Sequence, residues 1–443
     1  MSQVPTRTDA MLVPLGTQLP DDFADYIGNG PNALPADTFY NAMIAIKKLG
    51  IDCSYNIFRN EYLVGGGMMR DEIGEISDDR VLALRELVRQ NFQFEPSTRN
   101  MDDAVKRSCT MRSFHPIKDY FASLPQWDGI ERASRLLPDY FNAPDTPFNR
   151  AVSRIVMMAS VRRILQPGCK FDYMTVLQSP EGFNKSSAIA ALYGADYFTD
   201  QSTIGLRAKE VEEALRGMWA NESPELAGIT KQDWNNLKAN LSRQNDRGRR
   251  AYGRNPVSAP RTAIQWGTTN DYAYLRAASG ENRRFFSVDV LSNIDVAKII
   301  RDRDDIWSEA VELEATGASI ALPEEFWGDA RAEREKRTEL DPWEDILRDV
   351  ATRAAHSARN CAKHGDPLPY SVTDFRDEER IASSYLLSEI IGINAKDQTA
   401  QHGKRVGTLM RKLGWEGPKK IRMSDGSECK GYARSAQWLA DLM

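Results

Sequence analysis

The chain has 443 residues, 27% of them charged, and a net charge of −5. This length allows two or three domains with substantial cores, and the slightly acidic balance excludes nucleic-acid binding through overall basicity, so any such surface must be local. The five cysteines are scattered without CxxC pairing and the four histidines lack metal-ligand spacing, which argues against a disulfide framework or a zinc site. Without a membrane-spanning apolar run or a signal-peptide core, we expect a cytoplasmic protein that does not contact membranes.

The first third of the chain is predicted to hold an arm and a helical region. Residues 1–35 are rich in Pro, Gly, Asp and Asn, which predicts an arm with little fixed structure. Residues 36–165 have mostly helical patterns, as expected of a helical N-terminal or collar region. The glycines at 65–67 are not followed by a lysine, so a turn is favoured there over a phosphate loop.

Residues 166–295 are predicted to form an α/β core that begins with a strand, a loop and a helix. The β-rich run at 173–177 is followed by turn residues and then by a helical pattern that stops at Gly194. Triphosphates bind at such junctions, where helix N–H groups face the phosphates, a lysine reaches the terminal ones and the next hydroxyl holds Mg²⁺. Lys185 and Ser186 would take these two roles. The candidate nucleotide-binding residues are Ser179, Pro180, Glu181, Gly182, Phe183, Asn184, Lys185, Ser186 and Ser187.

This loop departs from the GxxxxGK(S/T) pattern at both defining glycines. Ser179 and Asn184 stand at those positions. Serine adds only a small side chain, and asparagine enters positive φ more readily than most residues, so the loop could still close around phosphate. An ordinary strand–turn–helix with a surface lysine stays open as the alternative.

An acidic pair follows the next predicted strand, residues 217–221. Glu222 and Glu225 lie where that strand gives way to a turn. In a nucleotide-binding sheet the carboxyl ends of strands carry one acid that orients Mg²⁺ and a second that activates the attacking water. Glu222 is the candidate metal ligand with Ser186, and solvated loop glutamates are the alternative.

A basic segment lies beyond a helix that Thr230 is predicted to cap. Arginines neutralise phosphates and a tyrosine can stack on a base, so this segment could bind a DNA backbone. A subunit interface, contact with a neighbouring subunit's nucleotide and a solvated basic loop are the alternatives. The candidate DNA-binding residues here are Arg247, Arg249, Arg250, Tyr252 and Arg254.

Two further strands are predicted, at 263–269 and 286–290. Asn270 closes the first and could position the attacking water or sense the γ-phosphate. Arg283 and Arg284 lie in the turn before the second, where an arginine could act as a finger on the nucleotide of an adjacent subunit. A salt-bridging turn is the alternative for this pair.

The last third is predicted to hold a helical connector, residues 296–368, and a winged-helix-like domain, residues 369–443. A helix with apolar residues at Val406, Leu409 and Leu413 is followed by a candidate hairpin around Ser424–Gly426. The basic side of that helix could bind duplex DNA through Lys404, Arg411 and Lys412. A small helical lid that makes protein contacts is the alternative.

Together these segments resemble the virulence-associated protein E family of phage, satellite and genomic-island proteins. The resemblance is carried by SPEGFNKSS, NESPEL, NDRGRRAYGR, PRTAIQWGTTN and SGENRRFFSV, in this order, with HPIKDYFASLPQWDGIERASRLL upstream. It implies a P-loop ATPase core related to AAA+ and superfamily 3 replicative helicases. By the same resemblance Lys185 and Ser186 match the Walker A lysine and hydroxyl, Glu222 and Glu225 the acidic pair, Asn270 the sensor, and Arg283 or Arg284 the finger.

The function expected from this resemblance is an ATP- and Mg²⁺-dependent DNA helicase or translocase of a phage or mobile-element replication system. It would act on single-stranded or forked DNA as a homo-oligomeric, hexameric ring, with any primase supplied by another chain. The alternative is a nucleotide-gated ATPase with slow or no hydrolysis that binds DNA or a protein partner, as a replication initiator or a regulatory or defence module. The altered phosphate loop keeps this alternative open.

Overall fold

The structure is a computed structural model that describes residues 21–28, 33–70, 72–249, 256–275, 281–338, 341–348, 378–423 and 426–435. The chain divides into two compact units. Unit 1 comprises residues 1–274 and 280–337, and unit 2 comprises residues 275–279 and 338–443. The first twenty residues of the expected arm lie outside the described part. Among the described residues, none of the helices combines the length and the apolar character needed to cross a membrane.

The N-terminal part of unit 1 packs three helices against a small sheet. The helices each begin at a side-chain cap, from Thr38, Ser77 and Ser97, and are α1 (Phe39–Lys48), α2 (Asp78–Phe92) and α3 (Thr98–Met111). The mostly helical pattern expected here is incomplete, because the structure adds a four-stranded sheet in the order β5-β4-β3-β6. Its strands are β3 (Asp52–Asn56), β4 (Glu61–Gly65), β5 (Gly74–Glu75) and β6 (Ser113–Phe114).

The glycines at 65–67 form a tight turn, as the sequence predicted. Gly66 and Gly67 have φ angles of 69° and 54°. A Cβ atom on Gly67 would lie 2.2 Å from the carbonyl oxygen of Gly50, so only glycine fits there. Within the expected arm the described residues form two short paired strands, β1 (Tyr26–Ile27) and β2 (Leu34–Pro35).

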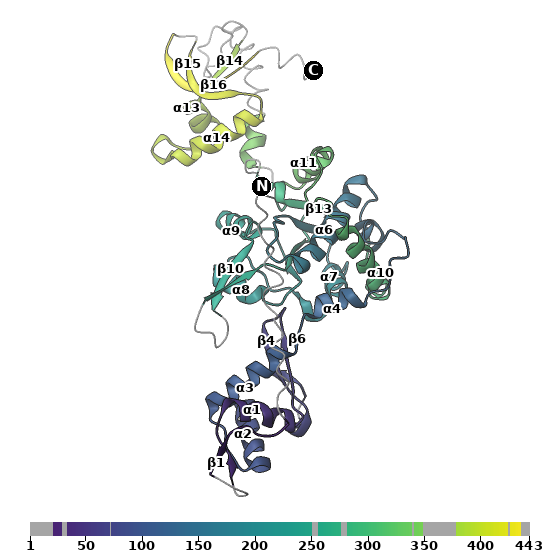
Figure 1. The fold of residues 1–443 in the computed structure, drawn as a ribbon. Helices are drawn as coiled ribbons and strands as arrows, with labels where there is room; N and C mark the ends of the chain where they lie inside the picture. The colour runs from purple at the N-terminus through teal and green to yellow at the C-terminus, as the bar shows by residue number, and fades with distance from the viewer. Residues whose placement is uncertain are drawn as a thin grey trace, which may run out of the picture. The chain divides into compact units, whose positions relative to one another are not determined.

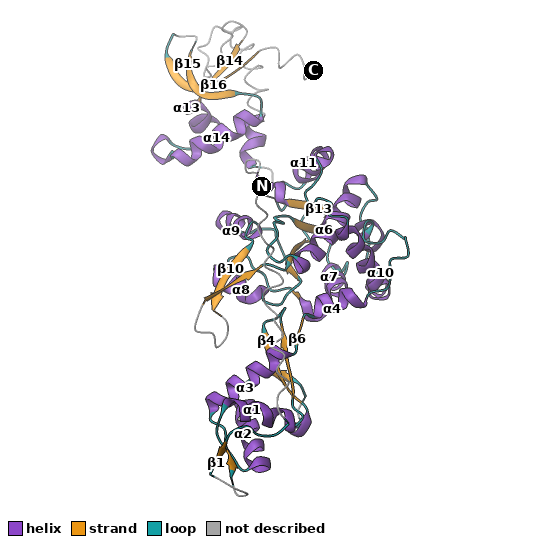
Figure 2. Ribbon diagram, viewed as in Figure 1, coloured by secondary structure: helices purple, strands orange, loops and turns teal. Residues whose placement is uncertain are grey.

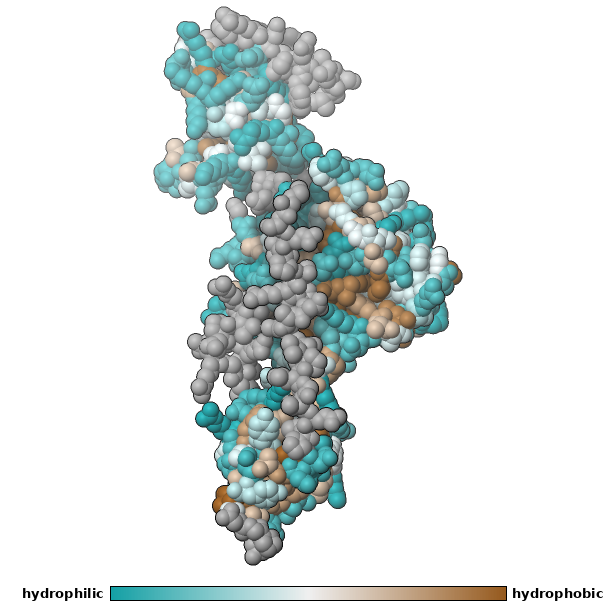
Figure 3. All heavy atoms as spheres, viewed as in Figure 1, coloured by the Kyte–Doolittle hydropathy of each residue, from teal (hydrophilic) through white to brown (hydrophobic). Residues whose placement is uncertain are grey.

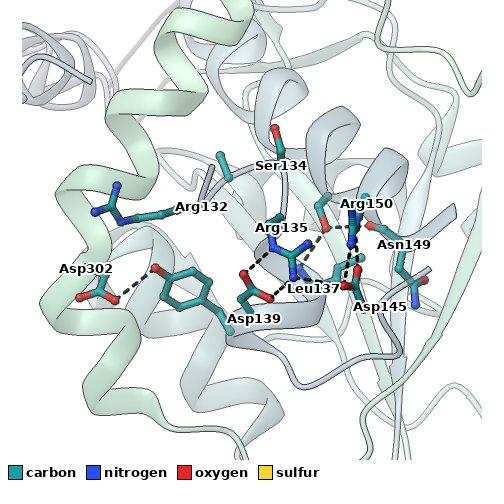
Figure 4. A network of polar contacts seen from close by, with 12 residues as sticks. Arg132, Ser134, Arg135, Leu137, Asp139, Asp145, Asn149, Arg150 and Asp302 are labelled. Atoms are coloured by element: carbon teal, nitrogen blue, oxygen red, sulfur yellow. Dashed lines mark hydrogen bonds and ion pairs between the residues drawn. The ribbon is translucent and has the colours of Figure 1, made fainter. Parts of the chain in front are cut away.

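Three helices connect this part to the central sheet. They are α4 (Pro116–Ser123), α5 (Leu136–Tyr140) and α6 (Pro147–Leu165). A network of polar contacts ties α5 and α6 to their surroundings (Figure 4). Arg135 binds Asp139 at 2.7 Å and Asp145 at 3.2 Å, and Arg150 pairs with the same Asp145. The hydroxyl of Tyr140 donates to Asp302 on the long helix α10 (Val296–Ala315) at 3.1 Å. These contacts fix the helical block against α10.

The centre of unit 1 is a five-stranded sheet in the order β13-β7-β12-β9-β8, shown in orange in Figure 2. All its neighbouring strands pair in parallel. The short apolar runs and the parallel pairing are those of a sheet buried on both faces, so an α/β core is confirmed. The strands are β7 (Met174–Gln178), β8 (Phe198–Thr199), β9 (Ala220–Ser223), β12 (Ile264–Thr269) and β13 (Phe285–Asp289).

Helices α6, α7 (Lys185–Tyr193) and α10 pack together on one side of this sheet (Figure 1). The core there is dense in aromatic rings. The rings of Trp219 and Trp307 stack with centroids 4.2 Å apart, and Phe141 stacks on Trp266 at 5.8 Å. Buried aromatic pairs of this kind contribute about 0.5–1.5 kcal/mol each beyond their area. This rigid layer sets the position of α7 relative to the strand ends.

The remaining elements of unit 1 are two helices, a hairpin and a helix that follows α10. Thr230 accepts a hydrogen bond at the start of α9, as predicted. The elements are α8 (Ala208–Leu215), α9 (Lys231–Leu241), the hairpin of β10 (Asn245–Arg249) and β11 (Pro256–Pro260), and α11 (Trp327–Lys336).

Unit 2 contains a three-stranded antiparallel sheet in the order β14-β16-β15 and helical segments before it. Helix α14 buries Val406, Leu409 and Met410, which are part of the stripe seen in the sequence. The elements are β14 (Glu378–Ala382), α13 (Ser383–Tyr385) with a following π-helical turn (Leu386–Ile390), α14 (Ala400–Lys412), β15 (Glu416–Arg422) and β16 (Glu428–Ser435). The predicted hairpin is therefore present, and assignment of a winged helix to unit 2 stays a prediction.

Candidate functional site

The loop between β7 and α7 lies at the carboxyl end of the central sheet. It starts at Ser179, directly after β7, and ends at Lys185, the first residue of α7. Gly182 and Asn184 have φ angles of 80° and 59°. Asn184 therefore adopts the left-handed conformation that the missing glycine would supply, which is why asparagine is tolerated there. Most of the loop side chains are exposed, so the helix N-terminus is open to a ligand.

The Lys185 ammonium group is held inside this loop. It donates to the carbonyl and hydroxyl oxygens of Ser179, at 3.0 and 2.8 Å, and to the carbonyl oxygen of Pro180 at 3.2 Å. A further bond of 2.9 Å joins it to the side-chain oxygen of Asn270 at the end of β12. Burial lowers the pKa of Lys185, and the carboxylate of Glu222 acts in the opposite direction. The lysine and the predicted sensor residue are therefore brought into direct contact.

Glu222 is buried inside strand β9 rather than in the turn after it. The predicted strand ended at Asn221, and the structure extends β9 to Ser223. One carboxylate oxygen of Glu222 accepts hydrogen bonds from Ser186 at 2.7 Å and from Thr268 on β12. The solvated-glutamate alternative is wrong for this residue, which is completely buried.

The second carboxylate oxygen of Glu222 is buried and has no hydrogen-bond partner. A buried acceptor without a partner is costly, so such an atom marks a place where a ligand is expected. Hydroxyl and carboxylate oxygens are the ligands that Mg²⁺ prefers, and it is usually held by one or two of them with phosphates and water. Ser186 and Glu222 therefore fit this ion. Among the described residues there is no group of three or more His, Cys, Asp or Glu side chains that could hold a metal by itself.

Glu225 and Asn270 occupy the exposed rim of the site. Glu225 follows β9 with a φ angle of 51° and an exposed side chain. The Asn270 amide nitrogen lies 3.5 Å from the Glu181 carboxylate, across the loop from its bond to Lys185. An exposed carboxylate at this edge is available to a water molecule, whereas Asn270 joins the lysine to the loop.

Arg283 and Arg284 lie at the other end of the sheet. They precede β13, whose first residue pairs with Met174, the first residue of β7. Strand β7 has five residues, which separates the two ends by about 16 Å. Arg284 is 3.4 Å from Asp172, a partner that the sequence did not indicate, and Arg283 is exposed. Neither arginine is brought to the site of its own chain.

The predicted DNA-binding residues fall in two places. Arg247 and Arg249 lie on β10, where the structure does not describe their side chains. Arg250, Tyr252 and Arg254 lie outside the described residues.

The other candidates, Lys404, Arg411 and Lys412, are exposed residues of α14. Arg411 donates to the carbonyl oxygen of Gly417 at 3.2 Å, and Lys412 is 2.7 Å from the Glu344 carboxylate.

Sequence reasoning missed Thr268 and Asp172. The paired threonines at the end of the predicted strand at 263–269 were the only signal for Thr268, because polar residues there are uncommon in a strand buried on both faces. Asp172 gave no signal, since its contact with Arg284 depends on the pairing of β7 with β13.

Comparisons with known proteins bear on the central part of the chain. The C-terminal region of NrS-1, solved in its apo form, is 13% identical with a TM-score of 0.49, and the match covers 88% of this chain and 98% of that chain. The active helicase Cch of SCCmec type IV is 11% identical with a TM-score of 0.35, over 88% of this chain and 94% of that one. No curated protein matches the chain. Residues 121–339 match the family model of the virulence-associated protein E-like domain, so the chain contains a domain of this family.

Proposed function

We propose that this chain is an ATP-dependent DNA helicase or translocase of a phage or mobile-element replication system. The observation that carries the proposal is the convergence of Lys185, Ser186 and Glu222 at the carboxyl ends of parallel strands. Parallel α/β sheets bind their ligands at this edge, and the acceptor without a partner on Glu222 calls for a cation there. The family match of residues 121–339 supports the same reading.

Each residue of the site has a part in phosphoryl transfer from ATP to water. The N–H groups at the start of α7 would bind the phosphates, and Lys185 would leave Asn270 to reach the terminal ones. Ser186 and Glu222 would hold Mg²⁺, which supplies charge neutralisation between the β- and γ-phosphates. Glu225 would accept a proton from the attacking water, and Asn270 would orient that water once Lys185 has moved.

A ring is proposed because the arginines cannot complete the site within one chain. Arg283 and Arg284 lie at the amino end of β13, whereas Lys185 follows the carboxyl end of β7. An arginine that stabilises charge on the γ-phosphate would have to come from an adjacent copy, as arginine fingers supplied in trans do. A closed ring of head-to-tail contacts, such as a hexamer, provides one finger to every site.

DNA contact is proposed for the β10–β11 hairpin and for unit 2 as a winged-helix-like domain. The hairpin carries the densest run of arginines in the chain, from Arg243 to Arg254. Cationic side chains on a two-stranded ribbon suit a phosphate backbone, and such binding falls steeply with salt.

The test is ATP hydrolysis and strand separation on forked DNA by the wild type, Lys185→Ala and Lys170→Ala. Lys170 is an exposed lysine that precedes β7, at the other end of the sheet. We expect DNA to stimulate hydrolysis in the wild type and Lys170→Ala, and Lys185→Ala to lose both activities. Equal activities in all three proteins would contradict the proposal.

A nucleotide-gated binder with slow turnover is the second candidate, and the contacts of Lys185 favour it. Three of its bonds go to oxygens of Ser179 and Pro180, so ATP would compete with the loop itself. Tight ATP binding with assembly but negligible turnover, with or without DNA, would select this candidate. Hydrolysis stimulated only by a protein partner would point to a regulatory or defence ATPase.

A further inference from the structure

The two-stranded ribbon β15–β16 of unit 2 carries a group of exposed cations that the sequence analysis did not assign. Lys420 on β15 is paired directly with Lys430 on β16, and Lys419 is paired with Gly431. Arg422, two residues beyond Lys420, is exposed as well. Hydrophilic residues cover most of the side of unit 2 drawn with this ribbon (Figure 3). We call Lys419, Lys420, Arg422 and Lys430 the ribbon cations.

The ribbon cations are only partly neutralised by their own sheet. Lys419 binds Glu416 at 2.8 Å, and Lys420 binds Glu428. Within the described part of unit 2, the side chains of Arg422 and Lys430 make no ion pair. Like charges directly opposite each other across a strand pair are destabilising, so the Lys420–Lys430 pair is an arrangement that an anion would relieve.

These lysines surround a shallow depression. Its volume is about 280 Å³, and it is lined by Pro418, Lys419, Lys420 and Lys430. A volume of this size has room for a phosphate group with its water. Three ammonium donors converge there and carboxylates are absent from the lining residues, which suits a phosphate diester better than a cationic or apolar ligand.

Helix α14 is less available for such binding than its sequence suggests. Lys412 is engaged by the buried carboxylate of Glu344, and Arg405 binds Asp341 and lies 3.9 Å over the ring of Trp343. Arg411 is turned to the carbonyl oxygen of Gly417. These contacts bind α14 to the rest of unit 2, and of its basic residues only Lys404 lacks a side-chain contact within the described residues.

We propose that the β15–β16 ribbon, rather than α14, is the surface through which unit 2 binds the sugar–phosphate backbone of duplex DNA. A two-stranded ribbon fits along or into the major groove of B-DNA, and lysines on both strands reach phosphates without reading bases. The choice of DNA as partner rests on the proposed function, but the inference does not depend on ATP hydrolysis. The expected binding is strong at low salt and independent of sequence.

The test compares two triple variants of the full chain for binding to labelled duplex DNA without nucleotide. One is Lys419→Gln with Lys420→Gln and Lys430→Gln, and its matched control is Lys404→Gln with Arg411→Gln and Lys412→Gln. Each lost phosphate contact reduces the salt dependence of log Kd by about 0.9. Loss of three contacts should reduce the change in Kd between about 50 and 200 mM salt by roughly 40-fold for the ribbon variant. The control should keep most of the wild-type salt dependence.

Several outcomes would overturn the inference. A ribbon variant with the wild-type salt dependence, or a larger loss in the α14 variant, would place the contact elsewhere. Binding of the wild type to vesicles of anionic lipid but not to duplex DNA would replace nucleic acid by a membrane surface. A wild type that binds no DNA but hydrolyses ATP would overturn this inference and leave the ATPase site standing, whereas DNA binding without any hydrolysis would do the reverse. Thermal unfolding of both variants checks that they are folded, and exposed lysines predict little change.

Discussion

Asn184 sets the backbone path at the entrance to α7 through its φ angle of 59°. Because a β-branched residue is strained in this region, Asn184→Ile should lower the free energy of unfolding by about 1–2 kcal/mol relative to Asn184→Gly. We expect Asn184→Gly itself to retain nucleotide binding, since glycine is the usual residue there. Urea unfolding of the two variants measures the difference. Equal stability would mean that the left-handed conformation is not a constraint.

Glu222 offers a test of the metal site that leaves its neighbours in place. Glu222→Gln keeps an oxygen that can accept from Ser186 and Thr268 but removes the charge that faces the partnerless position. Hydrolysis should fall by about 100-fold or more, while ATP binding stays close to that of the wild type. A fluorescent ATP analogue and a phosphate-release assay separate the two effects. Undiminished hydrolysis would rule out Glu222 as the metal ligand.

The individual residues of the site could be predicted only as far as local spacing reaches. The lysine–serine pair at the start of a helix and the acid after an apolar run identified Lys185, Ser186 and Glu222. Their bonds to Asn270 and Thr268 could not be predicted, because both partners come from β12 and depend on which strands are neighbours. The burial of Glu222 was missed for the same reason: a strand one or two residues longer moves its side chain from the turn into the sheet.

At the scale of elements, helix α4 depends on a neutral histidine. The Nδ1 atom of His115 accepts from the backbone N–H of Lys118 at 3.2 Å and caps the helix, and burial lowers the pKa of His115 to about 4. The unfolded chain then binds a proton that the folded one does not between about pH 6.5 and 4, so this contribution to stability is complete above pH 6.5 and is lost as the pH falls. We expect a loss of about 1–2 kcal/mol, reduced by the partial exposure of the ring.

The comparison for His115 is His115→Asn, which can cap the helix and does not titrate. The difference in free energy of unfolding between wild type and variant should change by that amount between pH 7 and pH 4.5. A difference that stays constant with pH would contradict the role of the neutral ring. Carboxylates such as Asp119 titrate in both proteins and cancel in the comparison.

Helix α11 is fixed to strand β13 by a buried arginine. Arg337 is completely buried and pairs with Asp289 at the end of β13 and with Glu333 on α11. Removing one partner of a buried pair leaves the others uncompensated, so Arg337→Ala should cost about 3 kcal/mol of unfolding free energy. Arg331→Ala on the same helix is the control, since its exposed pair with Glu335 should contribute under about 0.5 kcal/mol. Similar losses in both variants would refute this account of the α11 contact.

Elements with strong local signals were predicted well. The Thr230 cap of α9 and the apolar stripe of α14 needed only neighbouring residues. Strands β3 and β4 were missed because Asp52, Ser54 and Glu61 interrupt any clear alternation, and the pair is stabilised by cross-strand partners and by packing against α3. The winged-helix assignment of unit 2 is still a prediction.

For the whole molecule, a shared active site predicts complementation between two inactive variants. Lys185→Ala lacks the phosphate-binding lysine, and a variant with Arg283→Ala and Arg284→Ala lacks the finger. In an equal mixture of subunits, roughly a quarter of the interfaces join an intact lysine to an intact finger, so roughly a quarter of wild-type hydrolysis should return. No recovery after exchange of subunits would argue against fingers supplied in trans. Electron microscopy with an ATP analogue and forked DNA would give the symmetry of the assembly.

The order of the central sheet was the part of the molecule furthest from the sequence. The chain order of the strands is β7, β8, β9, β12, β13, but in the sheet β12 lies between β7 and β9. This insertion brings Asn270 to Lys185 and Thr268 to Glu222, and it follows from packing of the whole unit rather than from any one segment. The family resemblance supplied the expectation of an α/β core, and spacing alone would not have done so.

Calorimetric titration of Mg²⁺ and ATP into the wild type and Lys185→Ala tests most directly whether the edge formed by β7, β12 and β9 binds a nucleotide. We predict one ATP per chain for the wild type, affinity that depends on Mg²⁺, and a loss of at least about 10-fold in Lys185→Ala, because one charge-assisted contact to phosphate contributes about 1.5–3 kcal/mol. Equal affinity in the two proteins, or no binding of ATP to the wild type at all, would contradict the assignment of this site.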